Sequence, residues 1–90
     1  MSHSNKDTLL HQLKVAKSSV EVGGRYFHYK HPDKFYTILR IGFIEKTEEV
    51  CVIYEAEFED ELVWVRTLTD FLSKVKLEDV EEIDRFTKVE

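Results

Sequence analysis

One stretch of the chain, EVCVIYEAEF at residues 49–58, alternates between two kinds of side chain with a period of two. One side of the alternation is apolar and consists of Val50, Val52, Tyr54, Ala56 and Phe58. The other side carries glutamates at positions 49, 55 and 57 together with Cys51 and Ile53. Successive side chains of a strand point to opposite faces, so this segment predicts a β-strand with one buried face. The rest of the chain must supply strands that pair with it and apolar side chains that cover it.

Similar patterns predict strands on both sides of this segment. Residues 25–30, RYFHYK, place Tyr26, His28 and Lys30 on one face of a strand, with two further aromatic rings on the other. Residues 31–34, HPDK, predict a turn, because proline supplies no amide donor to a ladder. Residues 35–44 then form a strand that is apolar on both faces, and residues 59–61 an acidic hairpin tip. A fourth strand at 62–66 and a short last strand at 85–89 complete the set.

Helical signals lie at the start of the chain and after the fourth strand. Ser4 and Asp7 form a capping pattern, and apolar residues follow at positions 9, 13, 16 and 20, one stripe of an amphipathic helix over 4–20. Thr67 and Asp70 predict the start of a short helical turn by the same logic. Apolar residues at 77, 80 and 83 predict either a further helical turn or a loop with buried anchors.

These elements predict a mostly β fold, a small SH3-like antiparallel barrel of four to five strands. An N-terminal helix precedes the barrel, and a short helical turn comes before the last strand. We expect one domain over residues 1–90, with a leading helix at 4–20 and a barrel core at 22–88.

Composition indicates in which cellular compartment the protein resides and which classes of binding partner are excluded. The net charge is −5, with a balance of +4 over residues 1–40 and −9 over residues 41–90, which argues against a uniformly basic surface for nucleic acid. Cys51 is the only cysteine, so an intramolecular disulfide is excluded. The N-terminus has no signal-peptide pattern, and the longest apolar run is too short to span a membrane. We therefore expect a cytoplasmic protein without membrane contact.

Catalytic and metal-binding patterns are weak. A nucleophile and base can be assembled from Cys51, His28 and a glutamate, but a cysteine in the middle of a strand is more typical of packing. The histidines have no recognised metal spacing, and glutamates 55, 57 and 59 are more typical of a solvated strand face than of a cation site. Gly23 and Gly24 follow a helix and precede a strand, the reverse of a phosphate loop. We predict no catalytic residue, cofactor or metal.

One candidate ligand-binding face remains. It consists of Tyr26, His28 and Lys30 from the first strand with Trp64 and Arg66 from the fourth. If the two strand faces meet in space, they offer rings for stacking with cations beside them. The alternative is that Tyr26 and Trp64 fill the core while the cations only reach solvent.

A series of short motifs resembles a known family. It runs through G-x-Y-x-H-Y-K (Gly24, Tyr26, His28, Tyr29, Lys30), Tyr36, V-I-Y (52–54), W-V-R (64–66), Phe71 and R-F (85–86). The series, over about residues 22–88, resembles a family of small bacterial proteins known only as a domain of unknown function, some members of which are fused to or annotated with Nudix hydrolases. The family usually has proline after W-V-R, where this chain has Thr67. Its leading helix also lies outside the family core.

The resemblance implies a compact, mostly β domain without an established activity. It adds weight to His28, Lys30, Trp64 and Arg66, although Arg66 has the alternative role of pairing with a carboxylate such as Glu55. We therefore predict a non-catalytic binding module for a peptide, a nucleotide or a short single-stranded nucleic acid. The alternatives are an auxiliary domain for nucleotide-processing, Nudix-type enzymes, and a small hydrolase that uses His28 with a nearby glutamate. An exposed apolar face on the leading helix would instead indicate a dimer or a protein partner.

Overall fold

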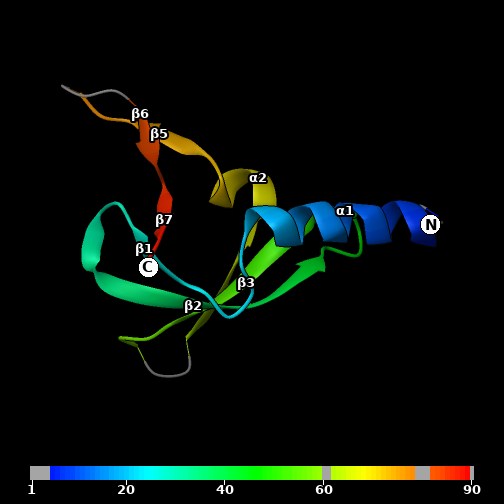
Figure 1. The fold of residues 1–90 in the computed structure, drawn as a ribbon, viewed down its shortest axis with the longest axis horizontal. Helices are drawn as coiled ribbons and strands as arrows, with labels where there is room; N and C mark the ends of the chain where they lie inside the picture. Colours follow the sequence, from blue (N-terminus) through cyan, green and yellow to red (C-terminus); the bar gives the residue numbers. More distant parts are fainter. Residues whose placement is uncertain (1–4, 60–61, 79–81, 90) are drawn as a thin grey trace.

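The computed structural model describes residues 5–59, 62–78 and 82–89, and its centre is a five-stranded antiparallel sheet (Figure 1). The strands are β1 (Arg25–His28), β2 (His31–Phe43), β3 (Val50–Ala56), β4 (Val63–Thr67) and β7 (Phe86–Lys88). Their order across the sheet is β4-β3-β2-β1-β7. The strand predicted from the alternating stretch is therefore confirmed as β3, next to the long central strand β2.

A register shift in β2 lets the sheet bend without losing its buried face. Ile38 pairs with Tyr54 and Ile41 with Val52, so Leu39 and Arg40 share the space between two inward-facing isoleucines. An extra residue of this kind increases the local twist of a sheet. Ile38 is 1 % exposed, so the bend takes place directly over the core.

The predicted turn at residues 31–34 is wrong. The hairpin turns at Tyr29 and Lys30, because His28 already pairs with His31. Phe27 pairs with Phe35, so Pro32 and its two successors in β2 have no opposite residue on β1. A proline is tolerated at such an irregularity because no ladder hydrogen bond depends on its missing amide proton.

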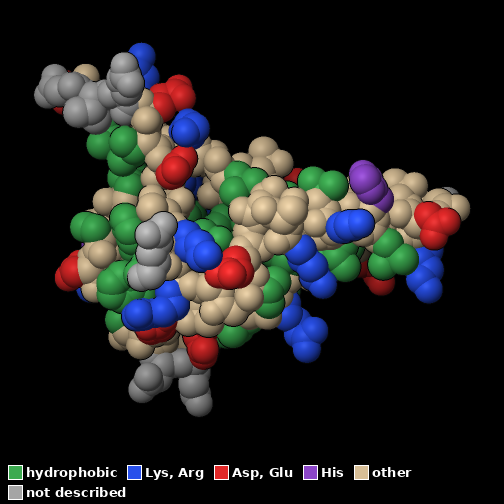
Figure 2. Space-filling model, viewed as in Figure 1, with side chains coloured by type: hydrophobic (Ala, Val, Ile, Leu, Met, Phe, Trp, Pro, Cys, Tyr) green, Lys and Arg blue, Asp and Glu red, His purple; other side chains and the backbone are tan. Residues whose placement is uncertain are grey.

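Helix α1 (Lys6–Ser19) begins at Asn5, whose side chain accepts a hydrogen bond from the amide of Asp7 at 2.7 Å. The predicted cap at Ser4 lies outside the described residues. Burial deepens toward the end of the helix, where Ala16 and the C-cap residue Val20 are fully buried. The basic side chains of α1 are the lysines at 6, 14 and 17, and blue side chains lie along the helix in Figure 2, as expected for its solvated side. No helix in the described ranges is long and apolar enough to cross a membrane.

Helix α2 (Leu68–Phe71) confirms the predicted turn after the fourth strand. Thr67 caps it by accepting a hydrogen bond from the amide of Asp70 at 3.1 Å. The helical alternative for residues 77–83 is wrong where the structure describes them, because Ile83 lies in a strand. β5 (Lys74–Lys76) and β6 (Glu82–Asp84) form a separate two-stranded ribbon in which Val75 pairs with Ile83. Val80 and most of the acidic tip at 59–61 lie outside the described residues.

The core lies on the concave face of the sheet. It consists of Val20, Tyr26, Ile38, Val52, Tyr54, Phe71 and Phe86. Phe71 from α2 stacks on Phe86 from β7 with 4.3 Å between ring centroids and 7° between planes. The helices therefore deliver side chains into the hollow of the sheet.

The prediction of a closed barrel is wrong. The outer strands of the five-stranded sheet are β4 and β7, and the described parts of these strands do not pair with each other. Closure is unnecessary, because Val20 and Phe71 fill the concave face from the helices. Figure 1 shows α1 and α2 on the same side of the sheet and the β5–β6 ribbon leading away from it. The sheet stays open, and part of its concave face remains uncovered.

Candidate functional site

The uncovered part of the concave face is a pocket of about 270 Å³, referred to below as the concave pocket. It is lined by His28, Lys30, His31, Tyr36, Tyr54, Trp64, Arg66 and Phe86. Four of the five residues predicted from the sequence thus lie together: His28 and Lys30 from the β1–β2 hairpin, Trp64 and Arg66 from β4. The period-two pattern turns His28 of β1 and Trp64 and Arg66 of β4 to this face. The predicted first strand at 25–30 is too long, because β1 ends at His28, and Lys30 reaches the pocket from the hairpin turn.

The prediction of Tyr26 as a ligand-binding residue is wrong. Its ring is 7 % exposed and meets the edge of Phe71 at 5.5 Å, so α2 covers it. Its hydroxyl accepts a hydrogen bond from the amide of Glu21 at 3.0 Å, which fastens the end of α1 to the sheet. Tyr26 therefore belongs to the core and not to the pocket.

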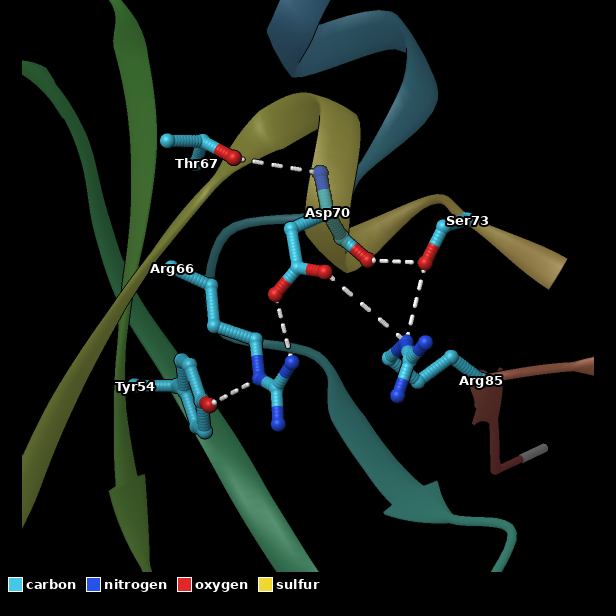
Figure 3. Close-up of polar contacts among 6 residues, drawn as sticks. All are labelled: Tyr54, Arg66, Thr67, Asp70, Ser73 and Arg85. Atoms are coloured by element: carbon cyan, nitrogen blue, oxygen red, sulfur yellow. Dashed lines mark hydrogen bonds and ion pairs between the residues drawn. The ribbon is translucent and has the colours of Figure 1, made fainter. Parts of the chain in front are cut away.

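Arg66 is fixed in place by neighbours on two sides (Figure 3). Its Nε donates to the hydroxyl of Tyr54 at 3.0 Å, and its Nη1 donates to Oδ2 of Asp70 at 2.5 Å. Burial lowers the pKa of Arg66, but these two partners outweigh burial and leave the pKa raised. Arg66 therefore does pair with a carboxylate, as the alternative prediction for it stated, but the partner is Asp70 and not Glu55. A guanidinium has five N–H donors, so these two bonds leave others for a ligand.

A second arginine, Arg85, lies close to the carboxylate of Asp70. Arg85 donates from Nε to Oγ of Ser73 at 2.9 Å, and the same Nε lies 4.0 Å from Oδ1 of Asp70 (Figure 3). Ser73 in turn donates its hydroxyl proton to the backbone carbonyl of Asp70 at 2.6 Å. Thr67 accepts a hydrogen bond from the amide of Asp70 and so fixes its backbone, while both arginines lie at its carboxylate. The network gives Arg66 one preferred orientation.

His28 is a neutral ring in a positive environment. Its pKa is lowered from 6.5 to about 4, first by burial and then by the charges of Arg66, Arg85, Lys30 and His31. Its Nδ1 accepts a hydrogen bond from the amide of Lys30 at 3.2 Å, so the proton of the neutral ring sits on Nε2. The ring meets the edge of Phe86 with 5.0 Å between centroids. At neutral pH, His28 therefore offers one N–H donor and carries no charge.

The rim and the floor of the pocket differ in character. Lys30 and Trp64 form an exposed rim, with Trp64 50 % exposed. Tyr36, Tyr54 and Phe86 form the floor and meet one another edge to face at 5.3–6.0 Å. Burial raises the pKa of both tyrosines, so their hydroxyls stay protonated at neutral pH. The floor supplies rings, and the rim supplies a cation and a half-exposed indole.

Sequence reasoning did not include His31, Tyr36, Tyr54 and Phe86 in the site. The sequence placed Tyr54 on the apolar face of its strand, and only the register of the structure, which pairs Tyr54 with Trp64, brings it to the pocket. Tyr36 was part of the motif series, but its strand is apolar on both faces, so no alternation indicated which way its side chain points. No carboxylate is among the described lining residues, although Asp70 pairs with Arg66 and the charge of Glu59 acts on Tyr36. Lys30 and the remaining N–H donors of Arg66 are therefore the groups that can bind an anion.

Other candidate chemistry lies elsewhere or has another role. Cys51 is 2 % exposed, and burial together with the charge of Glu49 raises the pKa of its thiol, so it is a packing residue. Glu57 accepts two hydrogen bonds from Arg25 at 2.8 Å, which lower its pKa. In the described part of the chain, no group of three or more histidine, cysteine or acidic side chains is placed to hold a metal ion.

Comparison with known proteins places this arrangement in a family. Residues 24–88 match the family described as "Protein of unknown function (DUF1653)". The chain belongs to the DUF1653 family. This agrees with the resemblance to a family of unknown function that its motifs suggested. The matched span begins after α1 and contains every residue of the concave pocket.

The DUF1653 fold is also known from a crystal structure. The DUF1653 protein from Bordetella bronchiseptica is similar to this chain with a TM-score of 0.62 and 26 % sequence identity. The similarity covers 74 % of this chain and 85 % of that one. No curated protein matches the chain at a significant level. The family assignment thus fixes the fold and leaves the function to be argued from the pocket.

Proposed function

We propose that this DUF1653 protein is a non-catalytic binding module that holds an anionic group of its ligand in the concave pocket. The observation that carries the proposal is the meeting of Lys30 and Arg66 with the half-exposed ring of Trp64 in one hollow. A phosphate of a nucleotide or of a short single strand satisfies this chemistry, and so does a carboxylate of a peptide. Each ligand places an anion beside the cations and a flat or apolar group against the rings.

The fixed position of Arg66 supports binding. Tyr54 and Asp70 already hold its guanidinium, so less side-chain entropy is lost when a ligand binds. Trp64 stands at the rim with half of its surface in solvent, and that surface is available for stacking. The pocket therefore combines a fixed donor with an open ring.

A hydrolase is less well supported. A general base needs a group that orients it and stabilises its protonated form, usually a carboxylate. Among the described residues, the charges that act on His28 are cations; burial first and these cations second lower its pKa to about 4. A protonated His28 is therefore destabilised, which is the opposite of what a base at neutral pH requires.

The experiment is a titration followed by the fluorescence of Trp64, the single tryptophan of the chain. The probes are a nucleoside monophosphate, a short oligonucleotide and an acidic peptide, each at low and high salt. We expect a change in emission with at least one probe, and weaker binding at high salt because the charges are screened. The nucleotide arm also tests the alternative role beside Nudix-type enzymes.

Two lysine variants test whether the ligand binds in the concave pocket. Lys30→Ala should weaken binding about tenfold, the effect of one lost charge contact near 1.4 kcal/mol. Lys34→Ala is the matched control, because Lys34 lies on the same hairpin, contacts Phe58 and is not part of the pocket lining. If no anionic probe changes the emission at low salt, or if both variants weaken binding equally, the proposal is wrong.

A further inference from the structure

The β4 strand has an open edge with unused backbone groups. The carbonyl of Leu62 accepts a hydrogen bond from the amide of Ala56, so these two residues form a hydrogen-bonded pair. Pairs of this kind alternate along an antiparallel ladder, which makes Tyr54–Trp64 and Val52–Arg66 the next two. The backbone groups of Val63 and Val65 therefore point away from β3. No described strand pairs with them there.

The β4 edge lacks the features that usually prevent an exposed edge from pairing with another strand. Val63, Trp64 and Val65 are 48 %, 50 % and 58 % exposed, and the register with β3 is regular, without a bulge. Exposed edges normally carry lysine, proline or a bulge, because an apolar edge invites another strand. The other edge of the sheet, β7, is only three residues long and includes Lys88. The two edges are thus unlike, and β4 is the one suited to strand addition.

The two faces of β4 present different chemistry to an added strand. Trp64 and Arg66 point into the concave pocket, where Lys30 lies. Val63 and Val65 point to the opposite face, where Val65 pairs with Ile53 of β3. An added strand would alternate in the same way. Side chains of one parity would meet the cations and rings, and those of the other parity would meet the valines.

We propose that the β4 edge binds an extended peptide segment of a partner protein as a sixth strand of the sheet. Its acidic side chain enters the concave pocket, and the apolar side chains before and after it cover Val63 and Val65. The recognised pattern is therefore apolar-acidic-apolar. This proposal rests on the proposed function and names the ligand class.

The charge of the pocket and the apolar surface of β4 favour a peptide over a second copy of the chain or a nucleic acid. A second copy of the chain would bring its own β4, and so a second Arg66, toward a pocket that already contains Lys30 and Arg66. Such a pairing of like charges is unfavourable. A nucleic acid would satisfy the pocket but would leave the exposed valines on the other face of β4 without a contact. A peptide accounts for the pocket, the valines and the open backbone groups together.

The test uses a capped pentapeptide of alternating valine and glutamate, with the glutamates replaced by glutamine in a control peptide. We expect the acidic peptide to change Trp64 emission and to protect the amide protons of Val63 and Val65 from exchange. The glutamine peptide should bind at least tenfold more weakly. A copy of the acidic peptide with N-methylated backbone should also lose at least tenfold, because it cannot form the ladder.

Variants of the protein separate the edge from the pocket. Val65→Pro removes an outward amide proton at a position where an edge strand tolerates proline. It should weaken peptide binding at least tenfold and leave the binding of a nucleoside monophosphate unchanged. Lys30→Ala should weaken both ligands. If Val65→Pro does not fold, Val65→Lys and the N-methylated peptide on the unmodified protein answer the same question.

Several outcomes would overturn the edge proposal. Equal binding of the N-methylated and unmodified peptides excludes a ladder at β4. Binding of nucleotides without any binding of the acidic peptide leaves the proposed function intact and removes the peptide. A dimer that forms without peptide and dissociates on Val65→Pro assigns the edge to a second copy. If neither peptide nor nucleotide binds, both proposals fail.

Discussion

At the scale of single residues, the pKa of His28 is set first by burial in the concave pocket and then by the cations around it. Its pKa is about 4 in the folded protein and 6.5 in an ordinary setting, so the unfolded chain takes up the proton first as pH falls. The stability that His28 contributes is thus complete above pH 6.5 and is lost as pH falls toward 4. We expect urea denaturation to show a free energy of unfolding that declines across this window, with a smaller decline in His28→Gln.

Nuclear magnetic resonance measures the same residue directly. The titration of the His28 ring should have its midpoint near 4, well below that of a solvated histidine. A bound anion should raise this midpoint, because it offsets the cations that oppose protonation. A midpoint near 6.5 in the free protein would show that neither burial nor the cations act on this ring.

Phe71 and Leu72 are neighbours in sequence with opposite roles. Phe71 is 2 % exposed and stacks on Phe86, whereas Leu72 is 46 % exposed. We expect Phe71→Ala to lower the free energy of unfolding by about 3–5 kcal/mol, the range for a buried ring. Leu72→Ala is the matched control and should change it by about 0.5 kcal/mol or less. Equal effects in chemical denaturation would contradict this packing of α2.

The sequence predicted which side chains share a strand face but not which of them remain open. Tyr26 and Tyr36 are paired neighbours on the same concave face. One is covered by Phe71 from α2, and the other lines the pocket. This difference depends on where a helix some forty residues later lies on the sheet, and no local pattern contains that information.

At the scale of elements, the α2 cap couples local structure to the pocket. Thr67 accepts the amide proton of Asp70, and Asp70 holds Arg66. We expect Thr67→Ala to cost about 1 kcal/mol of stability, the usual cost of a lost N-cap. It should also weaken anion binding, because Arg66 loses its fixed partner. Thr67→Ser keeps the hydroxyl and should behave as the unmodified protein in both urea denaturation and ligand titration.

Helices and strands that depend on patterns within a few residues could be predicted from the sequence. Features that depend on which strands pair could not. The alternation of β3, the stripe of α1 and the Thr67 cap all arise within a few residues. The turn was misplaced because Pro32 looked like a turn residue, and only the register with β1 shows that it lies in an irregular part of β2. Ile83 looked helical by its spacing, yet its partner Val75 makes it a strand residue.

At the scale of the whole molecule, the open sheet explains why a pocket exists. A closed barrel would have filled its interior with strand side chains. Here the helices fill one part of the concave face, and the remainder becomes the concave pocket. The strands of the five-stranded sheet were predictable from periodicity, whereas β5 and β6 were not predicted, and closure depends on which edges meet in space. The same open architecture leaves β4 as a free edge next to the pocket.

At the same scale, helix α1 lies outside the residues matched by the family. Val20 at its end is fully buried and belongs to the core cluster with Ile38 and Phe71. We expect Val20→Ala to lower the free energy of unfolding by about 2 kcal/mol, through lost burial and a small cavity. Removal of residues 1–21 should cost more, because it also exposes the apolar surface under Ala16.

Leu10→Ala is the matched control for this helix, because Leu10 is 51 % exposed and lies on the part of α1 away from the core. It should change the stability by about 0.5 kcal/mol or less. Thermal and urea denaturation of these three variants and of the unmodified protein measure the differences in stability. A shortened chain that unfolds at the same temperature as the full one would show that residues 22–90 form a complete core without α1. A shortened chain that unfolds earlier but keeps its Trp64 response to anions would show that α1 stabilises the sheet from the end remote from the pocket.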